Sequence, residues 1–393
     1  MVIEPVLKVG LAGVGSVSRT ILHNIQKIPG VKLTAVADIR EEPLAQVRGE
    51  YGVETFSSVE AMCESPDVDA VWICTPNLFH AEHTIIAAEA GKHVICEKPM
   101  AVSLDEAQSM VDAVDRTGVR YVQGHSKIFD PPIRRMREIV SSGELGRLIQ
   151  LNTWEFKPWI SGQPRLETEV DSSKGGGVLY RQGPHQTDVV RGIGGGMVKS
   201  LRAIVGRWNS AFPLAEGDYT AFLEFEDGAA ATMVFNGYGY FDITELTWGI
   251  GEGGQQRDPA SVKRERFASA VEADVKHEFA GARAERERVE REQRRTLQPF
   301  FGLTIVSCER GDIRQSPEGL YVYDRDGRRE VEVAPEGHGR GELTELRNAL
   351  REDRPTFPDA RWGMATLEVI LAILRSSRER REVTLSHQVP CPY

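Results

Sequence analysis

The first 125 residues alternate short apolar segments with segments of helical spacing, and this pattern constrains the fold more than any other feature. Five apolar runs predict buried strands, at residues 6–15, 31–40, 68–76, 92–99 and 119–125. Helical spacing between them, as in 81–91 and 103–118, predicts intervening helices. Regular alternation of strand and helix predicts a doubly wound parallel sheet, in which ligands lie beyond the carboxyl ends of the strands.

The chain has 393 residues, which is more than one hydrophobic core usually serves, so we expect two domains. We place a dinucleotide-binding Rossmann domain at 1–127 and a substrate-binding and oligomerisation α/β domain at 128–393. A highly charged stretch marks an insertion at about 255–299 in the second domain. Acidic and basic residues interleave there, which predicts a solvated helix.

A glycine-rich turn follows the first predicted strand. Gly13-x-Gly15-x-x-Ser18 opens a helix, where the backbone can approach a pyrophosphate. Because the third position is serine instead of glycine or alanine, the motif alone also fits an ordinary strand–helix turn. Asp38 ends the second strand and favours NAD, since a carboxylate accepts ribose hydroxyls and repels a 2′-phosphate. Arg40 would favour that phosphate, so NADP stays open. The cofactor contacts predicted here are Gly13, Gly15, Ser16, Val17, Asp38 and Arg40.

Three later motifs carry a family resemblance. "CTPNLFH" (74–80) and "EKP" (97–99) stand at the ends of successive predicted strands, and "GGGVLYRQGPHQTD" (175–188) follows in the second half. Together they resemble the GFO/IDH/MocA family of oxidoreductases over essentially the whole chain. The resemblance implies a Rossmann domain followed by an α/β domain with an open, mostly antiparallel sheet. It also implies a homo-oligomer, a dimer or a tetramer.

The resemblance also implies site residues. Lys98 matches the catalytic lysine, and a lysine beside an alcohol helps to deprotonate it as hydride leaves. His185 matches the second catalytic position, although a buried structural histidine is the alternative. Glu97 would orient Lys98 or simply pair with it. The further cofactor contacts implied are Thr75, Pro76, Asn77, His80, Glu97, Lys98 and His125.

Arg181 departs from the family pattern, in which many members carry aspartate four residues before the histidine. A guanidinium matches a carboxylate in shape and charge, so one interpretation is an anionic substrate. The other is a structural arginine paired with an acid such as Asp188. We assign Arg181, Asp188 and Trp159 to the substrate site; Lys157, Arg134 and Arg135 are weaker candidates for the same anion.

Within the family, residues 175–196 and 216–242 look most like the phthalate 4,5-cis-dihydrodiol dehydrogenase branch. That likeness implies oxidation of a carboxylated aromatic cis-dihydrodiol to a catechol. The alternatives are a sugar, inositol or glycoside dehydrogenase and, from another class, an NAD-binding regulatory sensor. An intact "EKP" argues against the sensor, which has no need of the lysine.

Composition excludes some classes of protein and indicates a compartment. The formal net charge of -10 argues against nucleic acid as a partner, because nucleic-acid binding needs a basic face. Five cysteines without a CxxC pair indicate reduced thiols in a cytoplasm and no zinc site. The first ten residues do not look like a signal peptide, and no apolar run has the length of a membrane span.

Overall fold

The computed structural model divides the chain into two compact units. The first unit comprises Met1–Ser126 and Gly339–Leu367, and the second comprises Lys127–His338 and Glu368–Tyr393. The predicted boundary after residue 127 lies one residue from this division. The return of residues 339–367 to the first unit was not predicted. The structure describes residues 6–261, 268–272, 275–276, 297–336 and 341–392. Most of the predicted charged helix therefore lies outside the described residues.

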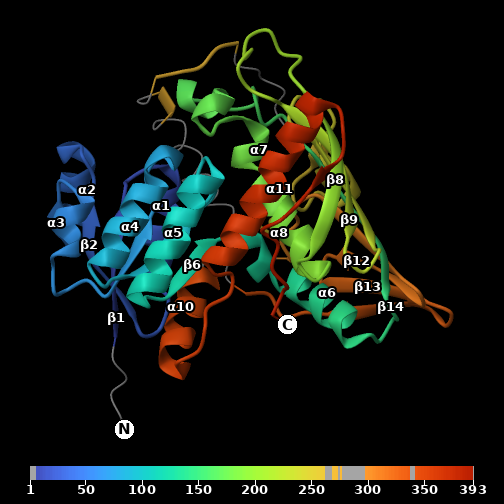
Figure 1. Cartoon of the computed structure of the whole chain (residues 1–393), viewed down its shortest axis with the longest axis horizontal. Helices are drawn as coiled ribbons and strands as arrows, with labels where there is room; N and C mark the ends of the chain where they lie inside the picture. The colour runs from blue at the N-terminus through green and yellow to red at the C-terminus, as the bar shows by residue number, and fades with distance from the viewer. Residues whose placement is uncertain (1–5, 262–267, 273–274, 277–296, 337–340, 393) are drawn as a thin grey trace. The chain divides into compact units, whose positions relative to one another are not determined.

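The first unit is built on a six-stranded sheet, of which β1, β2 and β6 are labelled in Figure 1. The strand order is β3-β2-β1-β4-β5-β6, and each neighbouring pair is parallel. Every residue of β4 is buried, as its purely apolar sequence requires. The predicted Rossmann sheet is therefore confirmed. Its strands are β1 Leu7–Ala12, β2 Val31–Ala37, β3 Glu54–Phe56, β4 Ala70–Ile73, β5 His93–Glu97 and β6 Tyr121–Gly124.

Helices connect these strands. Helix α5 shows the local rules: Ser103 accepts a hydrogen bond from the backbone N–H of Glu106, and Gly118 ends the helix in the left-handed conformation. Helix α10 lies against β5 and β6, which explains why residues 339–367 belong to this unit. The described α-helices are α1 Ser16–Ile25, α2 Glu41–Tyr51, α3 Val59–Cys63, α4 His80–Glu89, α5 Leu104–Thr117 and α10 Gly341–Glu352.

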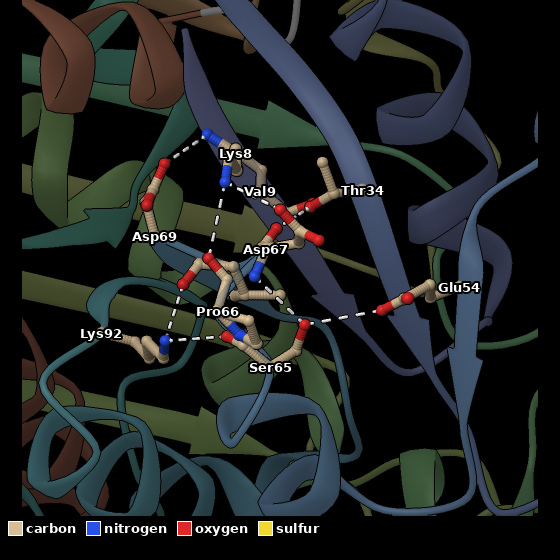
Figure 2. Close-up of polar contacts among 10 residues, drawn as sticks. Lys8, Val9, Thr34, Glu54, Ser65, Pro66, Asp67, Asp69 and Lys92 are labelled. Carbon is tan, nitrogen blue, oxygen red and sulfur yellow. Dashed lines mark hydrogen bonds and ion pairs between the residues drawn. The ribbon is translucent and has the colours of Figure 1, made fainter. Parts of the chain in front are cut away.

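A polar network fastens the amino ends of the strands (Figure 2). Lys8 donates through its backbone N–H to Asp69 at 2.9 Å and through Nζ to Asp67 at 2.8 Å. Lys92 Nζ donates to the carbonyl oxygens of Ser65 and Val68, at 3.0 and 2.8 Å. The segment before β4 is thereby tied to β1 and to the residue before β5. These contacts lie at the amino end of the sheet, opposite the carboxyl end where folds of this class bind their ligands.

The second unit contains a nine-stranded sheet in the order β14-β13-β12-β11-β7-β10-β9-β8-β15. Only β7 and β10 pair in parallel among its described strands; the other pairs are antiparallel. The predicted mostly antiparallel sheet is confirmed. Its strands are β7 Leu148–Phe156, β8 Val198–Gly206, β9 Asp218–Phe225, β10 Ala230–Asn236, β11 Leu303–Cys308, β12 Gly311–Ser316, β13 Gly319–Asp324, β14 Gly327–Glu332 and β15 Val383–Thr384.

Apolar side chains of α6, α8 and α11 pack with the buried face of this sheet in one core. Pro131 starts α6 and left-handed Gly143 ends it, which are the helix ends that these residue types favour. The helices are α6 Pro131–Ser142, α7 Gly177–Arg181, α8 Gly183–Ile193 and α11 Ala360–Glu379. No described helix of the chain is long and apolar enough to cross a membrane.

Within the glycine run at 175–177, position 177 requires glycine for a steric reason that can be tested. Gly177 has φ +81°, and a Cβ there would overlap the buried Glu216 carboxylate. Gly228 has a similar φ of +86°, with open space around its Cβ position. We expect Gly228→Ala to lower the free energy of unfolding by about 1 kcal/mol, through backbone conformation alone. Gly177→Ala should lower it by about 3 kcal/mol, because overlap is added.

Urea unfolding of the two variants checks this prediction, with Gly228→Ala as the matched control. Equal losses in the two variants would contradict the steric explanation.

Candidate active site

The glycine turn after β1 has the geometry that a pyrophosphate needs. Gly13 has φ +92°, and a Cβ there would lie 2.9 Å from the carbonyl oxygen of Cys74. Gly15 caps α1, and no atom lies within 4 Å of its Cβ position. Ser18 Oγ donates to the Gly13 carbonyl and accepts from the Gly15 N–H at 3.2 Å. The unusual serine therefore braces the turn, and the open space before α1 fits a bound phosphate.

Asp38 holds the same turn from β2. One carboxylate oxygen accepts from the Val14 N–H at 2.7 Å, and the other accepts from Arg40 Nε at 2.9 Å. Arg40 Nη2 in turn donates to the Val14 carbonyl at 2.9 Å. Burial raises the pKa of Asp38, but the bonds from Arg40 and Val14 outweigh it and leave the pKa below its usual value. Asp38 is therefore held ionised beside the glycine turn, and its contact with a cofactor ribose stays a prediction.

His80 links the two loops that follow β4 and β5. Its ring is buried, with Nδ1 2.7 Å from the Pro99 carbonyl oxygen and Nε2 2.9 Å from that of Thr75. The histidine therefore positions the loop that carries Lys98. A direct contact of His80 with cofactor stays a prediction.

The "EKP" segment is held by its neighbours in the sheet. Glu97 accepts a hydrogen bond from Trp72 Nε1 at 3.3 Å. Burial raises the pKa of Glu97 and outweighs the positive charge of Lys98, which lowers it. Gln123 Nε2 donates to the carbonyls of Cys96 and Glu97, at 3.0 and 3.3 Å. The Lys98–Pro99 peptide is cis. These contacts fix the backbone on either side of Lys98.

Parallel strands bring the predicted first-unit residues to one edge. The loops after β1, β2, β4, β5 and β6 supply them, so they meet at the carboxyl end of the sheet. Asn77 lies in the short helix Asn77–Phe79 after Pro76 and Thr75. His125 is buried directly after β6. Ser16 and Val17 begin α1.

The second-unit motif forms two consecutive helices. Gln182 separates α7 from α8 with a non-helical backbone. His185 lies in the first turn of α8, and its ring centroid is 5.5 Å from that of Phe301. Asp188, one turn later, is completely buried. His185 therefore borders an aromatic side chain from a distant segment, while Asp188 lies in the interior.

Arg181 pairs with Glu169. Their side chains meet at 2.9 Å, and Lys276 contacts the same carboxylate at 2.6 Å. Burial raises the pKa of Glu169, but Arg181, Lys276 and Arg165 outweigh it and lower the pKa to about 2. The ion pair expected under the structural interpretation is present, with Glu169 as the acid in place of Asp188. A substrate contact by Arg181 stays a prediction.

Trp159 is buried beneath an arginine. The Arg165 guanidinium carbon lies 3.8 Å from the centre of the Trp159 ring, and Arg165 donates to the Trp159 carbonyl. This cation–π contact occupies one face of the indole. The ring that the sequence assigns to a substrate wall is thus stacked on a charged side chain.

The sequence missed a cluster of four charged residues around Phe301, which we call the lysine–glutamate cluster. The sequence suggested Lys157 alone, because the cluster has no motif and its members come from three separated segments. The lysines contact Glu252 and lie over the Phe301 ring. Its members are Lys127, Glu155, Lys157 and Glu252.

No group of three or more His, Cys, Asp or Glu side chains in the described part of the chain is arranged to hold a metal ion.

Comparison with known proteins agrees with both units. A family model described as "Oxidoreductase family, NAD-binding Rossmann fold" matches residues 7–125, and a model of the GFO/IDH/MocA C-terminal domain matches 133–244. A 1-carboxy-3-chloro-3,4-dihydroxycyclohexa-1,5-diene dehydrogenase of Comamonas testosteroni is 30% identical over 95% of each chain. Inositol 2-dehydrogenase 3 of Saccharopolyspora erythraea is 29% identical over 70% of this chain and 81% of its own.

A solved structure from Bordetella bronchiseptica superimposes with a TM-score of 0.84 at 35% identity, covering 97% of this chain and all of the other. The Rossmann unit and its glycine turn define an NAD-dependent oxidoreductase. The chain belongs to the GFO/IDH/MocA oxidoreductase family.

We predict that the Asp38–Arg40 pair sets the preference between NAD and NADP. We expect Asp38→Ser to raise the ratio of kcat/KM for NADP over NAD by about tenfold or more. The change removes repulsion of a 2′-phosphate and releases Arg40 to bind it. Steady-state kinetics with both cofactors measure the ratio. Asp67→Ser, in the network at the opposite edge (Figure 2), is the control and should leave it unchanged. An unaltered ratio in Asp38→Ser would contradict the assignment.

Proposed function

We propose that this enzyme oxidises one hydroxyl of a carboxylated cyclohexadiene cis-diol and yields a catechol. The observation that carries the proposal is the Comamonas testosteroni relative, whose name specifies such a diol and which aligns over 95% of both chains. Arg181 supports it, since aspartate is common at this position in polyol-oxidising members and a guanidinium suits an anion.

In the proposed reaction, bound NAD supplies the acceptor for hydride. Lys98 hydrogen-bonds the reacting hydroxyl and takes its proton as the C–H bond breaks. His185 assists by holding or relaying a proton at the substrate oxygen. The ketone formed tautomerises to the catechol by moving a ring proton. Because aromatisation is strongly favourable, the protein has mainly to position the diol and manage one proton.

Oxidation of an inositol or a sugar is the second candidate. Relatives named inositol dehydrogenases are 29% identical to this chain, almost the same as the diene dehydrogenase. Lys98 and His185 suit both reactions, because oxidation of a diol and oxidation of a sugar both remove a proton and a hydride from a secondary alcohol. Arg181 and the extent of the alignment are what favour the carboxylated diol. A sensor without catalysis has no use for Lys98.

We also propose that the chain assembles as a homodimer or a homotetramer. Trp154 and Phe222 are 40% and 52% exposed, although both lie within strands of the nine-stranded sheet. They alternate with the buried residues of β7 and β9, so they point to the face that the core helices do not cover. Large exposed apolar side chains on one sheet face are typical of a subunit interface. Sedimentation velocity tests this expectation.

A substrate panel tests the proposed function. With NAD, we expect a carboxylated cis-dihydrodiol to be oxidised faster than an uncarboxylated cis-dihydrodiol, inositol or glucose, followed as growth of reduced-nicotinamide absorbance. Lys98→Met should lower kcat by about 10²-fold or more and retain NAD binding. Arg181→Ala should raise KM for the carboxylated diol about tenfold, because a charge-assisted contact is lost.

Arg375→Ala removes an exposed ion pair on α11 and is the control for loss of a guanidinium. Thermal unfolding of each variant verifies that it is folded. Turnover of inositol or glucose with no turnover of any cis-dihydrodiol would overturn the proposal in favour of the second candidate.

A further inference from the structure

One aromatic ring organises the lysine–glutamate cluster. The Nζ atoms of Lys127 and Lys157 lie 5.8 and 4.8 Å from the centre of the Phe301 ring. The His185 ring is 5.5 Å from the same ring. Two ammonium groups and the predicted catalytic histidine therefore surround one side chain of the second unit. An apolar ring edged by cations suits a flat, anionic molecule.

Glu252 bridges the two lysines. Its Oε1 contacts Lys157 Nζ, and its Oε2 lies 3.6 Å from Lys127 Nζ. The side chains of Lys127 and Lys157 are only 3% and 19% exposed, whereas that of Glu252 is 42% exposed. The carboxylate thus covers two buried cations from the solvent side. This is the arrangement in which a carboxylate from solution would also be held.

The backbone around Glu252 belongs to no helix or strand. Glu252 lies between Gly249 and Gly254, which have φ of +76° and +75°. Glu155, by contrast, is fixed in β7 and buried. It lies 3.8 Å from Lys157, and its Oε2 has no hydrogen-bond partner among the described residues. Lys157 therefore has one carboxylate neighbour held by the sheet and a second held by a glycine-rich loop.

Charge decides which carboxylate gives way to an incoming anion. Glu155 and Glu252 both contact Lys157, so a third carboxylate at the same ammonium would be repelled by both. Burial raises the pKa of Glu155 to about 7, with a further contribution from the charge of Glu252. Glu155 is therefore partly protonated near neutral pH, and Glu252 is the carboxylate that contacts both lysines. An anion gains the lysines by displacing Glu252.

We propose that Lys127 and Lys157 form the binding site for a ring carboxylate of the substrate, and that Glu252 occupies this site until the substrate displaces it. The inference rests on the proposed function, whose substrate carries that carboxylate. Glu252 is then a specificity residue: an anion replaces its interactions with the lysines, whereas a neutral ring cannot. The site accepts aromatic and cyclohexadiene carboxylates and discriminates against their uncharged counterparts.

Binding of benzoate, with benzamide as its neutral counterpart, tests this inference. Calorimetry is done on the full-length protein with NAD present. Glu252→Gln removes the competing charge, so the Kd for benzoate should fall about tenfold, while that for benzamide stays the same. Lys157→Met should abolish benzoate binding. Glu245→Gln, an exposed glutamate seven residues earlier, is the matched control and should bind benzoate as the wild type does.

Unchanged or weaker benzoate binding by Glu252→Gln would overturn the inference, as would undetectable benzoate binding in both wild type and Glu252→Gln. Glu252 is partly exposed, so this variant should fold even if Lys157→Met does not, and Lys127→Gln offers a second test of the lysines.

The two proposals fail differently. Oxidation of a carboxylated diol combined with unshifted benzoate binding would refute only the lysine site. Shifted benzoate binding without oxidation of any diol would refute only the proposed substrate.

Discussion

Parallel alignment of six strands is the constraint on which the cofactor site depends. Each strand ends at the same edge, so the loops after β1, β2, β4 and β5 meet there although they are far apart in the chain. The opposite edge is closed by polar contacts from Lys8 and Lys92 (Figure 2). At the carboxyl end, the bonds from Asp38, Ser18 and His80 hold the loops in place.

In the second unit, each of two glutamates contacts two cationic side chains. Arg181 and Lys276 share Glu169, and Lys127 and Lys157 share Glu252. A buried charge is costly unless an opposite charge and hydrogen bonds compensate it. A site that keeps cations beside such carboxylates can exchange a protein carboxylate for a substrate carboxylate at little net cost. That exchange is how the proposed lysine site would connect the second unit with the proposed anionic substrate.

Individual elements show how much of the fold could be predicted from the sequence. Strand β4 and helix α5 lie where the apolar run at 68–76 and the helical spacing at 103–118 predict them, within a few residues. The return of α10 to the first unit could not be read locally, because it depends on packing against β5 and β6, more than 200 residues earlier. The partner of Arg181 could not be predicted either, since Glu169 is 12 residues away in the short 3-10 helix Glu167–Val170.

The sequence by itself determined the family, the Rossmann sheet, the glycine turn and the identity of Lys98 and His185 as candidates. These features depend on residues adjacent in the chain, where spacing and backbone conformation are local properties. Only the tertiary structure decided that Trp159 stacks on Arg165 and that Arg181 pairs with Glu169. It alone brought Lys127, Lys157 and Glu252 around Phe301. Charge pairing between distant segments leaves no periodic trace in the sequence, because it depends on where the folded chain places each group.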